Sequence, residues 1–265
     1  MREALAGRPL LGTFVKLPRP EVVDVLAGVG YDFIVVDLEH GQASYAEARE
    51  TLLAARANGV QALVRIGHLD PALANRLLEA GASGIQLSTV TSSAQATAFV
   101  RALRYQPVGD RSISLAQPAA RYGAVAMKPY LDAFTSAPLA VGQLETAAFD
   151  DPLDDILTPL EVAFIGPADL SVAAGTPGDI ASGVAARVIA EIEQSAARTG
   201  TLLGTFVANA EGAAAAAASG YRYIVIGSDL AVLGRAAGGQ IAAAEAAVEA
   251  VRSGTVAGPV AGAAR

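Results

Sequence analysis

The sequence predicts a single-domain (β/α)8 barrel, an α/β fold in which eight parallel strands alternate with helices. Eight short apolar runs alternate with segments of helical periodicity along the 265 residues, which is the number that such a barrel requires. Most of the runs are continuous in apolar residues, as expected of parallel strands covered on both faces. No glycine-rich dinucleotide fingerprint or phosphate-binding loop follows any of them, so a doubly wound sheet is the less favoured alternative.

The predicted strands end at a glycine, a proline or a polar residue. In chain order they are 11–16, 33–36, 60–66, 85–90, 139–144, 162–165, 202–207 and 223–226.

The segments between the strands carry helix start and stop signals. Ser44 followed by Glu47 forms a capping box, and Pro71 after Asp70 fits the first helical position. The predicted helices are 21–28, 44–58, 70–80, 92–105, 153–157, 180–198, 211–218 and 229–251. The proline-containing stretch 106–138 is predicted to hold only short helical pieces, and long connections of this kind often serve function.

Composition limits the classes of partner and cofactor. The formal net charge of −7 argues against a nucleic acid or an anionic membrane as partner. The absence of cysteine excludes disulfides, iron–sulfur clusters and thiol nucleophiles. Neither a signal peptide nor an apolar stretch long enough to span a membrane is present, so we expect a cytoplasmic location. The barrel domain is expected over 1–252 and a disordered tail over 253–265.

Charged and polar residues lie at or just beyond the ends of several predicted strands, and in a barrel these strand ends form the active-site mouth. The residues are Asp37, Glu39, His40, Arg65, Gln143, Glu145 and Asp169. Glu145 and Asp169 follow neighbouring strands, and two carboxylates completed by water and substrate oxygens suit Mg²⁺ or Mn²⁺. The alternative is that each carboxylate caps a helix or pairs with an arginine.

His40 is one of two histidines, and its neutral imidazole is able to accept a proton near pH 7. Asp37, three residues earlier, is placed to orient the ring; the alternative is a hydrogen-bonded structural histidine. Arg65 ends a buried run, where a guanidinium stabilises an enolate or carboxylate oxygen or pairs with a nearby acid. His68 stands at a helix entry and is expected to be structural.

Lysines are scarce, and this argues against imine chemistry. The chain has only Lys16 and Lys128, and a Schiff-base aldolase needs a lysine inside the barrel. Lys16, at the end of the first predicted strand, is within reach of the mouth but is expected to stand apart from the acid cluster. Metal-assisted chemistry is therefore preferred.

Six strings in chain order resemble the HpcH/HpaI aldolase/citrate lyase family, the metal-dependent class II pyruvate aldolases of the phosphoenolpyruvate/pyruvate superfamily. They are DLEH (37–40), LVR (63–65), RYQPVGDR (104–111), QLET (143–146), FIGPADLS (164–171) and IGSDL (226–230). The resemblance implies that Glu145 and Asp169 bind a divalent metal, Mg²⁺, Mn²⁺ or Co²⁺. It also implies that His40 with Asp37 is the acid/base pair and that Arg65 holds the keto or enolate oxygen.

The resemblance extends to substrate binding and assembly. It implies that Gln143 lies beside the metal and that the backbone around Gly166, Pro167, Ala168 and Asp169 receives the pyruvate carboxylate. It further implies a homohexamer, a trimer of dimers with exchanged final helices, in which Glu79 reaches a neighbouring subunit's site. One departure is Ser88, which stands where the family usually has proline.

The function expected from these residues is reversible aldol cleavage of a 2-keto-4-hydroxy acid to pyruvate, or a close 2-keto acid, and an aldehyde. A citrate-lyase-like or acyl-CoA lyase is the alternative among enzymes. Few lysines are available for a coenzyme A phosphate, although Arg104, Arg111 and Arg121 keep that option open. The alternative of another class is a ligand-binding barrel without catalysis.

Overall fold

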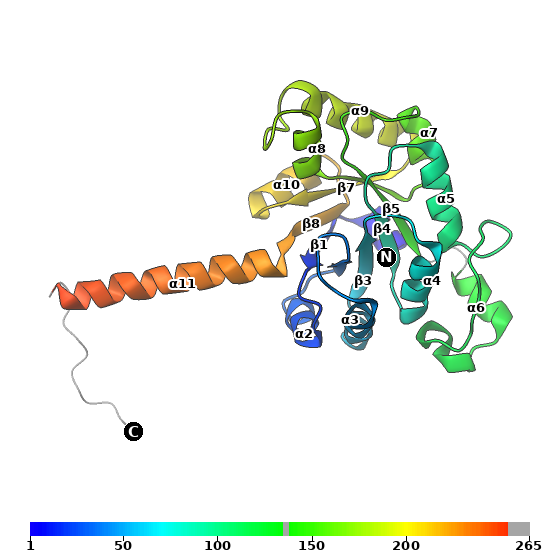
Figure 1. Ribbon diagram of the computed structural model, residues 1–265, viewed down its shortest axis with the longest axis horizontal. Coiled ribbons are helices and arrows are strands. Elements are labelled where there is room, and N and C mark those ends of the chain that lie inside the picture. Colours follow the sequence, from blue (N-terminus) through cyan, green and yellow to red (C-terminus); the bar gives the residue numbers. More distant parts are fainter. Residues whose placement is uncertain (135–137, 254–265) are drawn as a thin grey trace.

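A computed structural model describes residues 1–134 and 138–253. Eight parallel strands close into a barrel in chain order, with the last strand paired to the first (Figure 1). They are β1 (Leu10–Val15), β2 (Phe33–Asp37), β3 (Gln61–Ile66), β4 (Gly84–Leu87), β5 (Leu139–Leu144), β6 (Val162–Ile165), β7 (Leu202–Val207) and β8 (Tyr223–Ser228). The predicted (β/α)8 barrel is therefore confirmed.

Eight helices follow the predicted segments. They are α2 (Pro20–Gly28), α3 (Tyr45–Ala57), α4 (Pro71–Ala80), α5 (Ser93–Leu103), α7 (Leu153–Leu157), α9 (Gly183–Thr199), α10 (Ala210–Ala218) and α11 (Asp229–Arg252). The capping box of α3 is present: the Glu47 backbone N–H donates to Ser44 Oγ, and the Ser44 backbone N–H donates to Glu47 Oε2. Stretch 106–138 contains a 3-10 helix, η1 (Pro118–Gly123), and α6 (Met127–Phe134).

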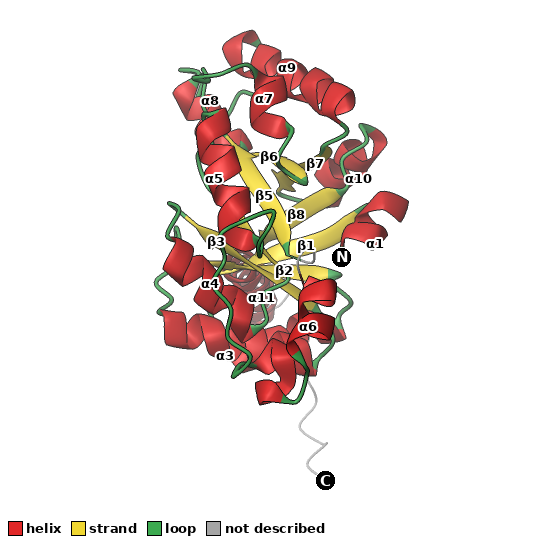
Figure 2. Ribbon diagram, turned by 90° about the vertical axis from the view of Figure 1, so that its right-hand side faces the viewer, coloured by secondary structure: helices red, strands yellow, loops and turns green. Residues whose placement is uncertain are grey.

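Two helices were not predicted. α1 (Arg2–Gly7) buries Leu5 completely against residues at the N-terminal ends of the strands, so it closes the end of the barrel opposite the mouth. α8 (Pro167–Ala173) begins directly after β6, with Pro167 at its first position. Figure 2 shows the outer helices arranged around the strands.

The fourth strand is shorter than predicted. β4 ends at Leu87, whereas the apolar pattern indicated a strand as far as Val90. The cause is Thr89, which adopts a positive φ of 51° and turns its backbone N–H toward the carboxylate of Glu145. The chain leaves the sheet at this point because one of its backbone donors binds a side chain at the mouth.

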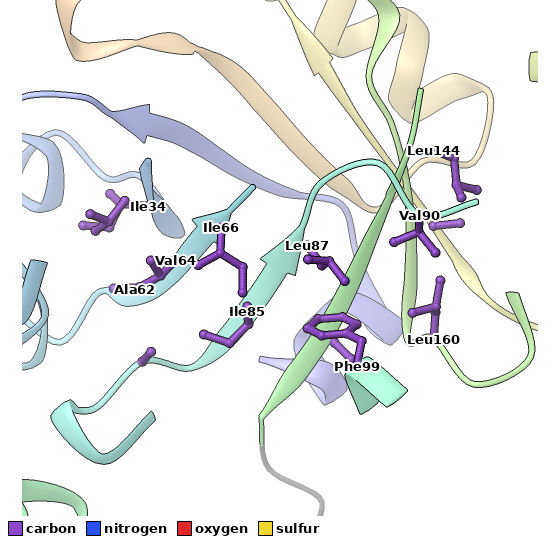
Figure 3. Packing of buried hydrophobic residues seen from close by; sticks show 14 of the residues in the cluster. Ile34, Ala62, Val64, Ile66, Ile85, Leu87, Val90, Phe99, Leu144 and Leu160 are labelled. Carbon is purple, nitrogen blue, oxygen red and sulfur yellow. The ribbon is translucent and has the colours of Figure 1, made fainter. Parts of the chain in front are cut away.

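Two apolar clusters hold the barrel together. The larger lies between strands and helices, where Ile85 and Leu87 of β4 pack near Phe99 of α5 (Figure 3). The smaller fills the barrel interior and includes Phe33 stacked on Tyr223, with ring centroids 4.4 Å apart. Both clusters bury side chains completely, so the strand ends that carry the polar residues stand on a close-packed base.

Helix α11 departs from the barrel instead of packing on it (Figure 1). Only Asp229, its first residue, is buried, and Leu233, Ile241 and Val248 each have more than half of their surface exposed. Within residues 1–134 and 138–253, no helix is both long and apolar enough to cross a membrane. The predicted disordered tail falls, apart from the exposed Ser253, outside the described residues.

Candidate active site

The carboxylate of Asp37, at the end of β2, is the most heavily bonded group at the mouth. Its side chain is completely buried. Arg65 at the end of β3 donates to it through Nε at 2.9 Å and Nη2 at 2.7 Å. Lys16 Nζ donates at 2.6 Å, and the backbone N–H groups of Glu39 and His40 donate at 3.1 Å. This carboxylate therefore joins the ends of the first three strands.

These contacts determine the ionisation of Asp37. Burial acts to raise the pKa of the carboxyl, but the hydrogen bonds and charges of Arg65 and Lys16 hold its pKa well below the usual range. The carboxylate remains charged at any physiological pH. Asp37 is thus a fixed anion that orients its cationic partners.

Lys16 does not stand apart from the acids, so that expectation was wrong. Its side chain follows β1 and is long enough to reach Asp37 on the neighbouring strand.

Arg65 also binds Glu39, a residue that was predicted at the mouth but given no role from the sequence. Arg65 Nη1 lies 3.2 Å from Glu39 Oε2, and Ser88 Oγ donates to the same oxygen at 2.5 Å. Phe14 lies under the guanidinium, with its ring centroid 4.3 Å away. The hydroxyl of Ser88, where the family usually has proline, thus binds an acid at the mouth.

His40 lies at the rim with a half-exposed imidazole. Its Nε2 lies 3.9 Å from Oε2 of Glu39. Asp37 contacts the backbone N–H of His40 and not the ring. The chain turns tightly between Asp37 and Gly41. A Cβ on Gly41 would lie only 2.0 Å from the carbonyl oxygen of Asp37, so the backbone here stays close to Asp37. The structure therefore replaces the expected Asp37–His40 ring contact with a backbone contact.

Glu145, just beyond β5, is a buried carboxylate on the opposite side of the mouth. Thr89 donates to its Oε1 through the backbone N–H at 3.0 Å and through Oγ1 at 2.9 Å, and Gln143 Nε2 donates to Oε2. Burial raises the pKa of the Glu145 carboxyl, and the charges of Asp169 and Glu39 act in the same direction. A cation placed among these acids would favour the ionised form.

A row of hydrogen bonds crosses the barrel interior to Glu145. Tyr223 Oη on β8 donates to Gln86 Oε1 at 3.2 Å, and Gln86 Nε2 donates to Gln143 Oε1 at 2.8 Å. Gln143 Nε2 then donates to Glu145. Burial raises the pKa of Tyr223 well above its ordinary value, so the hydroxyl stays a donor. Gln143 thus lies directly beside Glu145.

Asp169 lies in the first turn of α8, after β6, and is exposed. Gly166 stands between it and Glu145, and a Cβ on Gly166 would lie 2.5 Å from Glu145 Oε2. Only a glycine lets the backbone approach the carboxylate so closely. The region from Gly166 through Pro167 and Ala168 to Asp169 therefore borders the acid pair.

Glu79 lies on the second-last position of α4, next to the turn that leads into β4, and so at the end of the barrel away from its own mouth. The Asn75 amide is 3.4 Å from its carboxylate. Glu79 therefore adds nothing to the mouth of its own chain, and its role in a neighbouring subunit stays a prediction.

The acids at the mouth form a site of hard oxygen donors. Across residues 1–134 and 138–253, no three His, Cys, Asp or Glu side chains are placed together to hold a metal ion. Two protein carboxylates with remaining positions open to water and substrate oxygens are a donor set suited to Mg²⁺ or Mn²⁺. Glu145 and Asp169 fit such an ion, because the charge of Asp169 helps to raise the pKa of the buried Glu145 and a cation would offset that repulsion.

A closed (β/α)8 barrel whose mouth combines carboxylates, a buried guanidinium and an ammonium defines a barrel enzyme. The model of the HpcH/HpaI aldolase/citrate lyase family matches residues 10–236. The chain belongs to this family.

Individual relatives agree with the family match. A hydroxypyruvate/pyruvate aldolase of Rhizorhabdus wittichii is 31% identical over 244 residues, covering 91% of this chain and 96% of the relative. A 4-hydroxy-2-oxo-heptane-1,7-dioate aldolase of Klebsiella pneumoniae is 30% identical and covers 88% of each chain. The crystal structure of a family member from Burkholderia cenocepacia superposes with a TM-score of 0.85 at 26% identity, over 92% of this chain and 98% of the other.

The Asp37–Arg65 pair generates a stability prediction. Asp37→Asn leaves the buried guanidinium of Arg65 with one carboxylate fewer, so the free energy of unfolding should fall by about 3–5 kcal/mol. The matched control is Asp110→Asn, which breaks an exposed pair with Arg101 and should cost less than about 1 kcal/mol. Urea unfolding followed by circular dichroism measures both.

The pH dependence provides a second check. The depressed pKa of Asp37 stabilises the fold fully above the unfolded pKa of about 4. This contribution is lost as the pH falls through the folded pKa. The stability difference between wild type and Asp37→Asn should therefore shrink below pH 4. A difference that is constant from pH 7 to pH 3 contradicts the assignment.

Proposed function

We propose that this protein catalyses reversible aldol cleavage of a 2-keto-4-hydroxy acid to pyruvate, or a close 2-keto acid, and an aldehyde. The observation that carries the proposal is the mouth, where the buried Glu145 follows β5, the exposed Asp169 follows β6, and two carboxylates hold the guanidinium of Arg65. The relatives named as aldolases support the same chemistry.

Glu145 and Asp169 would hold a divalent cation, with Mg²⁺, Mn²⁺ and Co²⁺ as the candidates. When bound, the cation supplies Lewis-acid stabilisation of the negative charge that develops on the keto oxygen. Gln143 fixes the orientation of the Glu145 carboxylate through its amide donor. The backbone from Gly166 to Asp169, which approaches Glu145 closely, receives the carboxylate of the 2-keto acid.

Arg65 binds the keto oxygen and offsets the charge of the enolate. Asp37 and Glu39 hold its guanidinium from two sides, so no reorganisation is needed as charge develops on the substrate. The side chain is almost fully buried, and a donor acting away from bulk water is worth more than one in solution.

His40 accepts the proton of the C4 hydroxyl as the C3–C4 bond breaks. The electron pair of that bond moves to C3 to form the enolate of the keto acid, and C4 becomes the aldehyde carbonyl. The enolate then takes up one proton at C3 and leaves as pyruvate. Glu39 Oε2 lies 3.9 Å from Nε2 of this imidazole.

Acyl-CoA chemistry is less well supported. Arg104 pairs with Glu161, which immediately precedes β6 and therefore lies at the end of the barrel opposite the mouth. Arg111 lies outside the barrel, where its Nε donates to Asn75 of α4. Two of the three arginines that had kept a coenzyme A phosphate in consideration, Arg104 and Arg111, are thus distant from the acids at the mouth.

The metal assignment predicts a complete loss of metal-dependent turnover in Glu145→Ala or Asp169→Ala. Each variant should keep the circular dichroism spectrum of the wild type, because the acids lie at the mouth and not in the apolar clusters. Pyruvate release from 4-hydroxy-2-oxopentanoate, coupled to lactate dehydrogenase, measures turnover with added Mg²⁺, Mn²⁺ or Co²⁺ and with EDTA. Full activity in either variant or in EDTA-treated enzyme refutes the metal site.

The assignment of His40 as base predicts that His40→Ala lowers kcat for cleavage by about 10²–10⁴, the usual contribution of a positioned acid/base group. Metal binding, followed by Mn²⁺ titration in electron paramagnetic resonance, should be unchanged. His68→Ala serves as the control, since this histidine stands at a helix entry. A loss that appears only as weaker Mn²⁺ binding makes His40 a ligand instead.

We also propose a closed homo-oligomer, a hexamer built as a trimer of dimers, in the cytoplasm. The support is α11, whose apolar residues remain exposed in one chain, so a helix of this kind is expected to bury a face against another subunit. Light scattering after size exclusion should give a hexameric mass at micromolar concentration. A monomeric mass with full activity excludes both helix exchange and a catalytic part for Glu79.

A further inference from the structure

Lys16 occupies a position at the mouth that the proposed mechanism leaves unused. Its ammonium lies 2.6 Å from Asp37 Oδ2, and its side chain keeps 25% of its surface exposed. An ammonium has three N–H donors. Asp37 takes one of them, and the other two have no partner in the part of the chain that the structure describes. Lys16 is therefore held in place by Asp37 while still offering donors to a ligand.

The exposed part of Lys16 faces a pocket of about 460 Å³ that also contains His40. The loops after β1 and β2 form its walls, with Arg19 and Gln42 among the lining residues, and Leu230 at the start of α11 adds an apolar contact. These elements lie across the mouth from β5 and β6, which carry Glu145 and Asp169. The pocket thus lies on the side of the barrel formed by β1 and β2, away from the strands that carry the acid pair.

Asp37 holds Lys16 and Arg65 side by side. Lys16 Nζ and Arg65 Nη2 both donate to Asp37 Oδ2, at 2.6 Å and 2.7 Å. A 2-keto-4-hydroxy acid likewise carries two oxygens close together, one on C2 and one on C4, with only C3 between these two carbons. A substrate whose keto oxygen lies at Arg65 therefore brings its C4 oxygen to the adjacent donor.

We propose that Lys16 is a further catalytic residue, which donates a hydrogen bond to the C4 oxygen and so serves the aldehyde half of the reaction. The proposal rests on the aldolase function proposed above. In cleavage, the proton of the C4 hydroxyl passes to His40 and negative charge gathers on the C4 oxygen until the C3–C4 bond breaks. In condensation, the same ammonium polarises the aldehyde carbonyl. Lys16 keeps its own protons throughout and forms no covalent bond.

The role as donor differs from two other roles for this residue. As a mere counter-ion of Asp37, Lys16 would support Arg65 and so affect the pyruvate half as much as the aldehyde half. As an amine nucleophile, it would form an imine with pyruvate. Lys16 Nζ donates to Asp37 at 2.6 Å, and an ammonium donor is not nucleophilic.

The test separates the two halves of the reaction. Exchange of the pyruvate methyl protons with D₂O, followed by NMR, needs the keto-acid half alone, because pyruvate has no C4 oxygen. Cleavage of 4-hydroxy-2-oxopentanoate needs both halves. Lys16→Met should lower kcat for cleavage by about 10²–10³, the usual loss for one donor to a developing oxyanion. The rate of methyl proton exchange should fall by no more than about threefold.

Two companion variants complete the design. Lys128→Met is the matched control, because Lys128 is the only other lysine and pairs with Asp132 on the surface of α6. It should leave both rates unchanged. Lys16→Arg keeps a cationic donor beside Asp37 and should recover part of the cleavage rate.

Each outcome bears on one hypothesis. Equal losses of exchange and cleavage in Lys16→Met, or no loss of either, overturn the assignment of Lys16. So does a reduced pyruvate adduct on Lys16, found by mass spectrometry after borohydride treatment. If the wild type catalyses neither reaction with any of the three metal ions, the aldolase function itself fails, which is a different result from an active wild type with an unaffected variant.

Discussion

The arrangement of the mouth depends on one buried carboxylate, that of Asp37. Three strands end beside it, and each contributes something that needs an anion: an ammonium from β1, backbone N–H groups beyond β2 and a guanidinium from β3. A single buried charge of either sign is costly, and only the combination is stable. The same contacts that neutralise Asp37 also aim Arg65 and Lys16, so folding and preorganisation of the site arise from one set of bonds.

The carboxylates on the opposite side of the mouth differ from Asp37 in their partners. Glu145 has hydrogen-bond donors but no cationic partner among the described residues, and burial together with nearby acids disfavours its charge. Around Asp37 the protein supplies its own cations, whereas around Glu145 and Asp169 it leaves the positive charge to be supplied from outside. This asymmetry divides the mouth into a part complete within the chain and a part suited to an added ion.

The sequence predicted the barrel and the strands from which the site residues come, because continuous apolar runs ending in polar residues are a local pattern. Glu145 and Gln143 were placed beside each other for the same reason. Contacts made by long side chains between strands were not accessible in this way. Lys16 was expected to stand apart from the acids, and Glu39 was expected at the mouth without a partner or a role. Thr89 was missed because its positive φ results from the bond to Glu145, which no periodicity encodes. Helices α1 and α8 are too short to show a clear apolar repeat.

The hydrogen bonds that run from Tyr223 through Gln86 and Gln143 have a direction. Each glutamine amide has a donor end and an acceptor end, so the orientation of one amide dictates that of the next. Tyr223 donates to Gln86, Gln86 donates to Gln143, and Gln143 donates to Glu145, so both NH₂ groups point along the row toward Glu145. An ionised Glu145 can only accept, so it requires the NH₂ end of Gln143 and thereby the same orientation in Gln86. The three hydrogen bonds therefore all donate in the same direction across the barrel interior, from Tyr223 to Glu145.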